Sequence, residues 1–172
     1  MAKITFIVGG ARSGKSRFAL KLTQQKSKKV AFIATCLPLD LEMNKRISIH
    51  RKSRPAHWQT FEEPKDLVLV LKKIGSQFDT IIIDCLTLWV SNLLLKGKKE
   101  IFIENKINQI LMLLKKNRSR SIIVSNEVGL GIVPNSKMGR AFRDIAGRIN
   151  QIVADKSDEV FFMVSGIPWR IK

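Results

Sequence analysis

The sequence predicts an α/β fold built on a mostly parallel β-sheet with helices on both faces, and two patterns indicate it. The first pattern is a set of short, largely apolar runs at residues 4–8, 30–34, 80–84, 121–125 and 160–164, expected to be strands. The second is the helical spacing of apolar residues between these runs. Largely apolar strands that alternate with helices are typical of a parallel sheet buried between two helical layers.

The segments between the strands are predicted to be helices because their apolar residues recur three or four positions apart. Pro64 suits the start of one such helix. Segment 40–54 is polar and basic, and we expect a surface helix or an irregular stretch that Pro55 ends. The apolar stripes are Phe18, Ala19 and Leu22, then Leu67, Val70 and Leu71, then Ile103, Ile107, Ile110, Leu111 and Leu114, and finally Phe142, Ile145, Ile149, Ile152 and Val153.

Length and composition predict a single domain over residues 1–172. A chain of 172 residues with 45% hydrophobic and 26% charged residues has the size and composition of an ordinary folded domain. No apolar run approaches the ~20 residues that span a bilayer. The first residues lead into a strand without the pattern of a signal peptide, so we expect a cytoplasmic protein without a membrane span.

The formal net charge of +17 is the unusual bulk property of the chain. Strongly basic chains often bind nucleic acid by neutralising its phosphates. Here the lysine clusters are scattered over likely loops and helix ends, without interleaved aromatic residues. We therefore predict that the charge serves small anionic substrates, with no nucleic-acid partner. A nucleic-acid-stimulated ATPase remains the alternative that the charge suggests.

The segment Gly9-Gly10-Ala11-Arg12-Ser13-Gly14-Lys15-Ser16 matches the phosphate-binding motif G-x-x-x-x-G-K-[ST] in full. Glycines let the backbone curl so that its N–H groups converge on phosphate oxygens, and the next helix adds its N-terminus. Lys15 can reach the outer phosphates, and the hydroxyl of Ser16 can bind Mg²⁺. Because the motif lies between a predicted strand and helix, we predict a P-loop NTPase domain of the RecA-like type.

Asp84 is the predicted second metal ligand. It ends the strand at residues 80–84, where P-loop proteins place an acid for Mg²⁺. The alternative is a helix N-cap for the segment that begins at Leu86. One carboxylate has two oxygens, so both roles can hold together.

His50 is the candidate nucleophile. It follows Arg46 and precedes Arg51, Lys52 and Arg54. Positive neighbours disfavour a protonated imidazole and keep a ring nitrogen available. A neutral imidazole beside a polyphosphate can attack phosphorus. The alternative is a solvated histidine on a surface helix.

Seven sequence blocks along the chain carry a resemblance to one enzyme family. The P-loop is shared with many proteins, but the segments around His50, 126–129 and 143–148 are far more specific together. On these blocks the chain resembles the bifunctional adenosylcobinamide kinase/adenosylcobinamide-phosphate guanylyltransferases of cobalamin biosynthesis. The blocks are 9–16, 33–35, Arg46–Pro64, Asp84–Leu94, Ser125–Pro134, Phe142–Gln151 and Val164–Pro168.

The resemblance implies two reactions at one nucleotide site. A nucleoside triphosphate, ATP or GTP, phosphorylates the aminopropanol hydroxyl of adenosylcobinamide, and GTP then donates GMP to that phosphate. The second reaction passes through a guanylylated histidine, and the matching position is His50. Lys15 and Mg²⁺ would offset charge on the leaving group. The residues that the resemblance assigns to GTP or its metal are the P-loop, Ile33, Ala34, Thr35, Arg51, Lys52, Ser53, Arg54, Glu62 and Asp84.

Three further expectations follow. Relatives in the family form small homo-oligomers, so by analogy we expect a homo-oligomer, a trimer. A plain P-loop small-molecule kinase, which transfers only the γ-phosphate, is the competing enzyme hypothesis. Glu127, Arg143 and Arg148 have no role that the sequence explains; they are candidates for core hydrogen bonds or subunit contacts.

Overall fold

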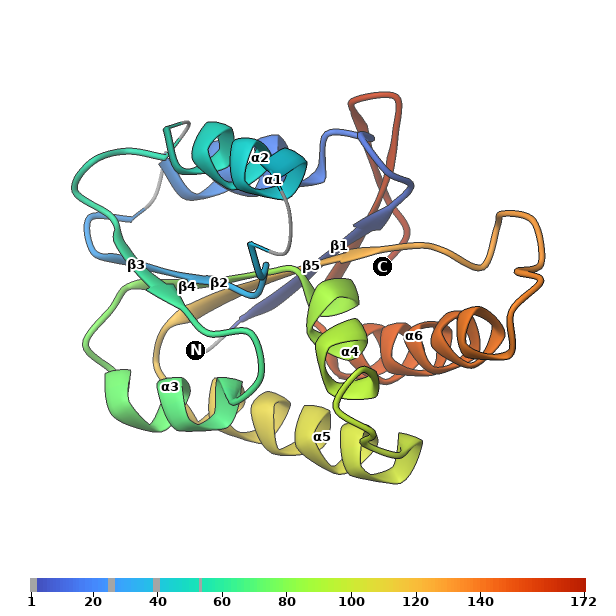
Figure 1. Ribbon diagram of the computed structural model, residues 1–172. Coiled ribbons are helices and arrows are strands. Elements are labelled where there is room, and N and C mark those ends of the chain that lie inside the picture. The colour runs from blue at the N-terminus through green and yellow to red at the C-terminus, as the bar shows by residue number, and fades with distance from the viewer. Residues whose placement is uncertain (1–2, 25–26, 39–40, 53) are drawn as a thin grey trace.

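Seven strands form one sheet in the part of the chain that the computed structural model describes, residues 3–24, 27–38, 41–52 and 54–172 (Figure 1). The elements in chain order are β1 (Ile4–Gly9), α1 (Lys15–Gln24), β2 (Val30–Ala34), α2 (Leu41–Lys52), β3 (Gln59–Glu62), α3 (Leu67–Ile74), β4 (Thr80–Asp84), α4 (Leu86–Leu94), α5 (Glu100–Lys116), β5 (Arg120–Asn126), α6 (Lys137–Lys156), β6 (Glu159–Val164) and β7 (Ile167–Arg170).

The strand order is β3-β2-β4-β5-β1-β6-β7, and every neighbouring pair is parallel except β6 and β7. The carboxyl ends of the parallel strands therefore meet at one edge of the sheet, where open α/β sheets bind ligands. Strand β5 lies between β1 and β4. This order places the end of β5 between the P-loop, which follows β1, and Asp84, which ends β4.

Helices cover both faces of the sheet, with α1 and α2 on one face and α3 to α6 on the other (Figure 1). Side chains alternate along the central strands to supply a core on each face. In β1, Phe6 and Val8 join the core under α3 to α6, whereas Ile7 joins the core beneath α1. The five apolar residues predicted for the stripe of α5 are all at most 2% exposed. The predicted mostly parallel sheet with two helical layers is confirmed.

The structure differs from the sequence prediction mainly at the two edges of the sheet. Strands β3 and β7, four residues each, were not predicted. Strand β3 is partly exposed and β7 is exposed along its whole length, and both lack the apolar run that identifies a central strand. Segment 40–54 contains a helix, α2, and Trp58 beyond it is buried.

Candidate active site

The P-loop joins β1 to α1, and its backbone explains its glycines. Gly14 has φ +92°, a conformation that side chains rarely adopt. A Cβ on Gly9 would lie 2.6 Å from the carbonyl oxygen of Met163, so no larger residue fits there. The turn between β6 and β7 supports the loop from outside, because Gly166 N–H donates to the Ser13 carbonyl at 3.0 Å.

Lys15 is held at the centre of the loop. Its side chain is almost fully buried, and Nζ donates to the Gly10 carbonyl at 2.6 Å. Burial lowers the pKa of Lys15 below its ordinary value of 10.5, opposed by the negative charges of Cys85 and Asp84. Burial also raises the pKa of the Cys85 thiol to about 12, so at neutral pH only Asp84 opposes the shift. A cation desolvated in this way is stabilised when phosphates bind.

Asp84 stands where β4 ends, and buried polar groups fix the backbone beside it. The hydroxyl of Thr35 accepts from the Cys85 N–H at 2.8 Å and donates to the Cys85 carbonyl at 2.7 Å. The Thr35 N–H donates to the carbonyl of Asp84 at 3.2 Å. Asn92, from α4, donates to the Thr35 carbonyl at 2.8 Å. These bonds hold the carboxylate of Asp84 at the carboxyl edge of the sheet.

Helix α2 supplies one wall of the site. Met43, Ile47, His50, Arg51 and Arg54 line the same cleft as the P-loop. Positions 43, 47, 50 and 51 lie on one face of the helix, because they are separated by four, three and one residues, and Arg54 follows beyond the end of the helix at Lys52. Met43 and Ile47 therefore face the cleft rather than the core, whereas the other apolar residues of α2, Leu41 and Ile49, are exposed at 88% and 59%.

The arginines beside His50 lie close to two carboxylates. The Arg54 guanidinium stacks on the Phe32 ring at 3.6 Å and donates to the Thr60 hydroxyl at 3.4 Å. Burial lowers the pKa of Arg54, opposed by the charges of Asp84 and Glu62. Arg51 forms an exposed ion pair with Glu62 at 3.8 Å. Planar guanidinium groups so placed suit phosphate oxygens.

The cleft measures about 1200 Å³ and brings most of the predicted site residues together. It has room for a nucleotide and part of a second substrate. The predicted residues that line it are Ala11, Arg12, Ser13, Gly14, Lys15, Ser16, Ala34, His50, Arg51, Arg54, Glu62 and Asp84.

The remaining predicted residues lie elsewhere. Gly9 and Gly10 shape the loop without lining the cleft. Ile33 and Thr35 are fully buried beneath it, Ile33 in the core and Thr35 bonded to Cys85. Lys52 is exposed at the end of α2 and does not line the cleft. Ser53 lies outside the described residues.

Asn126 is the main cleft residue that sequence reasoning missed. Its N–H donates to the Thr87 hydroxyl at 2.6 Å, and its carbonyl accepts from Asn150 at 3.1 Å. The backbone is thus fixed on both sides, and the residue lies between the P-loop and Asp84. In the sequence, Asn126 was marked only by its place in the family-like block at residues 125–134. The order of the strands is what places it in the site. Others missed are Arg17, Cys36, Pro38, Met43, Asn44, Ile47, Cys85, Leu88, Ser165 and Gly166.

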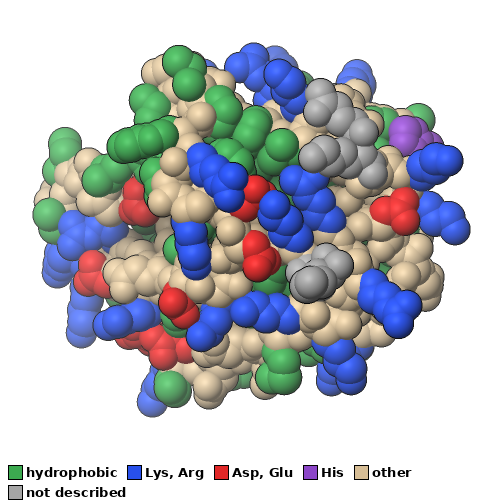
Figure 2. Space-filling model, turned by 180° about the vertical axis from the view of Figure 1, so that it is seen from behind, with side chains coloured by type: hydrophobic (Ala, Val, Ile, Leu, Met, Phe, Trp, Pro, Cys, Tyr) green, Lys and Arg blue, Asp and Glu red, His purple; other side chains and the backbone are tan. Residues whose placement is uncertain are grey.

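The positive charge of the molecule is spread over its surface. Figure 2 shows Lys and Arg scattered over one face, with Asp and Glu among them, rather than gathered in one stripe. The lining of the cleft itself includes five cations, with two carboxylates, Glu62 and Asp84; the cations are Arg12, Lys15, Arg17, Arg51 and Arg54. This local excess of cations suits a polyphosphate.

The fold and the phosphate-binding loop at residues 9–16 define the chain as a P-loop nucleotide-binding protein of the RecA-like class. Two solved structures share its fold. The RadB recombinase matches with a TM-score of 0.54 and 14% identity, over 94% of this chain and 74% of that chain. A KaiC-like protein from Pyrococcus horikoshii matches with the same score and identity, over 94% of this chain and 70% of its own.

Sequence comparison shows the family. Residues 5–171 match the family described as cobinamide kinase / cobinamide phosphate guanyltransferase, and the chain belongs to it. It is 42% identical to the bifunctional adenosylcobalamin biosynthesis protein CobP of Pseudomonas aeruginosa, over 96% of this chain and 95% of the relative. It is 40% identical to CobU of Salmonella typhimurium, which bears the same bifunctional description, over 96% and 98%. The chain is therefore a transferase with nucleotide substrates. No helix in the described residues is long and apolar enough to cross a membrane.

Proposed function

We propose that the cleft carries out two successive reactions: phosphorylation of adenosylcobinamide by ATP or GTP, and then transfer of GMP from GTP to adenosylcobinamide phosphate through a guanylylated His50. The observation that carries the proposal is that the P-loop, Asp84 and His50 open on one cleft. A P-loop alone supports phosphoryl transfer. The histidine on the facing helix adds a nucleophile that a plain kinase does not need.

In the guanylyl step an imidazole nitrogen of His50 attacks the α-phosphorus of GTP. The nitrogen–phosphorus bond forms, and the bond from the α-phosphorus to the bridging oxygen breaks. Pyrophosphate leaves with the bonding electrons, while the ring loses the proton on its other nitrogen. An oxygen of adenosylcobinamide phosphate then attacks the same phosphorus, His50 leaves and regains its proton, and adenosylcobinamide-GDP is formed.

The kinase step uses the same phosphate groups. The aminopropanol hydroxyl of adenosylcobinamide attacks the γ-phosphorus, and the bond from this phosphorus to the β,γ-bridging oxygen breaks. The nucleoside diphosphate leaves with the bonding electrons, and the hydroxyl proton passes to solvent. Lys15 and the P-loop N–H groups hold the phosphates for both steps. Arg51, on α2, and Arg54, just beyond its end, line the cleft with His50 and would add positive charge beside the α-phosphate.

Ser16 and Asp84 are the residues proposed to hold Mg²⁺. Both line the cleft, Ser16 at the start of α1 and Asp84 at the end of β4. One hydroxyl and one carboxylate fit a cation that takes few protein oxygens and completes its shell with phosphates and water. Bound there, Mg²⁺ would offset the charge of the outer phosphates.

Exposed apolar residues support the proposed homo-oligomer. Leu130 and Ile132, in the loop after β5, are 78% and 96% exposed, and Trp169 on β7 is 65% exposed. Figure 2 shows hydrophobic side chains gathered on the upper left of one face of the molecule. Apolar groups this exposed are typical of a contact surface. The trimeric state and the cytoplasmic location stay predictions.

Analysis of products tests the proposed sequence of reactions. Purified protein is incubated with adenosylcobinamide, ATP, GTP and Mg²⁺, and the corrinoid products are identified by mass spectrometry. We expect the wild-type protein to form adenosylcobinamide-GDP, and His50→Ala to stop at adenosylcobinamide phosphate. Equal formation of the GDP product by both proteins would remove His50 from the mechanism. Formation of the phosphate alone by the wild-type protein would favour the plain kinase.

A further inference from the structure

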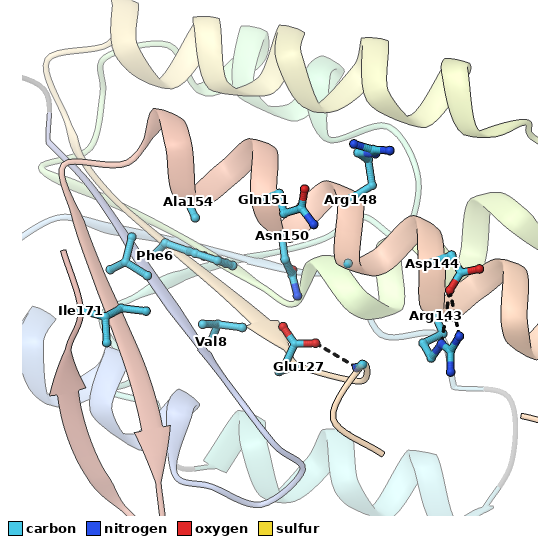
Figure 3. Close-up of a pocket in the computed structure, with 13 residues that line it drawn as sticks. Phe6, Val8, Glu127, Arg143, Asp144, Arg148, Asn150, Gln151, Ala154 and Ile171 are labelled. Atoms are coloured by element: carbon cyan, nitrogen blue, oxygen red, sulfur yellow. Dashed lines mark hydrogen bonds and ion pairs between the residues drawn. The ribbon is translucent and has the colours of Figure 1, made fainter. Parts of the chain in front are cut away.

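A second cavity of about 560 Å³ lies between α6 and the β1–β6–β7 side of the sheet (Figure 3). It contains Glu127, Arg143 and Arg148, the residues without a role in the sequence analysis. Its floor is apolar, with Phe6, Val8 and Ile171. Its rim carries both charges and the carboxamide of Gln151, whereas Asn150 lies buried within it.

Gly147 leaves space over this cavity that the fold does not require. It lies within α6, where glycine is less favourable than alanine. Apart from the adjoining residues and backbone of its own helix, a Cβ built on Gly147 would meet no described atom within 4 Å, and its φ is not positive. Neither the backbone nor packing within the described chain accounts for glycine at this position. The space in front of it is therefore available to a molecule from outside.

Asn150 presents a buried hydrogen-bond acceptor to the same cavity. The residue is 6% exposed and lines the cavity, and Figure 3 shows its side chain extending from α6 toward Glu127. Its Nδ2 donates to the Asn126 carbonyl at 3.1 Å, which fixes the orientation of the amide. Its Oδ1 has no partner among the described residues. A buried acceptor left unpaired is unfavourable, and an N–H group of a ligand would satisfy it.

The cavity adjoins the nucleotide cleft across the carboxyl edge of the sheet. Asn126 lines the cleft and Glu127 lines the cavity, and the Cα atoms of neighbouring residues are about 3.8 Å apart. Glu127 N–H donates to the Gly9 carbonyl at 3.0 Å, so the backbone of a residue that lines the cavity is bonded to the first residue of the P-loop. A flexible arm of a molecule held in the cavity can cross this edge to the phosphates.

The charges on the rim disfavour an anion. Arg143 pairs with Asp144 at 3.2 Å, and Arg148 lies 3.9 Å from Glu104. Glu127 adds a carboxylate, one oxygen of which accepts from the Gly129 N–H at 2.9 Å. Each arginine thus has a carboxylate close by. An apolar floor beneath paired charges and carboxamides suits an amide-rich ligand with an apolar body.

We propose that this cavity holds the cobinamide acceptor by the edge of its macrocycle. The inference rests on the proposed function. Cobinamide carries primary carboxamides around an apolar ring, so its N–H groups fit the Oδ1 of Asn150 and the carboxylate of Glu127. Its amide carbonyls fit Arg143 and Arg148. The aminopropanol arm then extends over Asn126 into the nucleotide cleft.

Filling the space over Gly147 tests the proposal without removing a contact. Gly147→Leu places an isobutyl group in the cavity. Gly147→Ala is the matched control, because it also raises the helix propensity of this position but adds only a methyl group. Binding of cobinamide is measured by equilibrium dialysis, from its visible absorbance, with the KM for cobinamide measured beside it. We expect Gly147→Leu to weaken binding by about tenfold or more and Gly147→Ala by far less.

Three further measurements keep the outcomes distinct. Labelling of the protein by GTP needs no cobinamide, so we expect both variants to retain it. Glu127→Gln, which keeps an acceptor for Gly129, is a second variant expected to weaken cobinamide binding. Unchanged cobinamide binding in both Gly147→Leu and Glu127→Gln overturns the proposal. A changed oligomeric state with unchanged cobinamide binding also overturns it, because the cavity would then be a subunit contact. Loss of GTP labelling in the wild-type protein would instead count against the proposed guanylyl-histidine, and dialysis still decides the cavity.

Discussion

The buried hydroxyl of Thr35 offers a quantitative test of how the strand ends hold Asp84. Thr35→Val keeps the shape of a fully buried side chain and removes its oxygen. The Cys85 N–H, which donates to that oxygen at 2.8 Å, then has no acceptor. A buried donor left unpaired costs about 1–3 kcal/mol. The Cys85 carbonyl still accepts from the Trp89 N–H at 3.2 Å, so the loss of the hydrogen bond from the Thr35 hydroxyl to this carbonyl adds little to the cost. We expect a loss of about 2 kcal/mol in the free energy of unfolding.

Thr23→Val is the matched control. Thr23 is equally buried, but its hydroxyl only donates to the carbonyl of Ala19, one turn earlier in α1, at 2.8 Å. Removing it orphans no donor, so we expect a cost of about 0.5 kcal/mol or less. Urea unfolding measures both, and thermal unfolding should show about 2–4 °C lost per kcal/mol for a chain of this size. Equal destabilisation by the two substitutions would refute the reasoning.

Three other predictions concern the nucleotide site and the core. The affinity for a GTP analogue should fall as pH rises through the pKa of Lys15, which burial lowers below 10.5. Binding in that pH range should take up protons, because phosphates favour the charged ammonium group. Calorimetry in buffers of different ionisation enthalpy measures the proton uptake, and its absence would contradict the prediction. Asp84→Asn should weaken Mg²⁺-dependent nucleotide binding far more than metal-free binding, and an equal effect on both would exclude a metal role. Ile107→Ala, at a fully buried position of α5, should lose about 2–5 kcal/mol in urea unfolding, and a loss below 1 kcal/mol would show that the core closes around the gap.

The central fold could be predicted because each interior strand is an apolar run and each long helix has an apolar stripe. The edge strands β3 and β7 could not, because four residues that are partly or fully exposed leave no such pattern. The P-loop could be predicted because its chemistry is contained in eight consecutive residues. Asn126 could not, since its place in the cleft depends on β5 lying between β1 and β4.

The face of α2 shows a second limit of sequence reasoning. Met43 and Ile47 are spaced as a weak apolar stripe, which ordinarily faces a core. In the structure they line the cleft with His50. Gly147 and Asn150 show the same limit for the second cavity. Both look like ordinary helix residues in the sequence, and only the packing of α6 against the sheet shows the space and the unpaired acceptor.

Retention of label on the protein tests the central claim most directly. The chain is incubated with Mg²⁺ and GTP labelled at the α- or the γ-phosphate, denatured, and assayed for bound label. We predict retention from the α-label alone, lost in acid and absent in His50→Ala, because a phosphoramidate is acid-labile. No retained label under conditions where GTP demonstrably binds would contradict the guanylyl-histidine and leave a plain kinase as the better account.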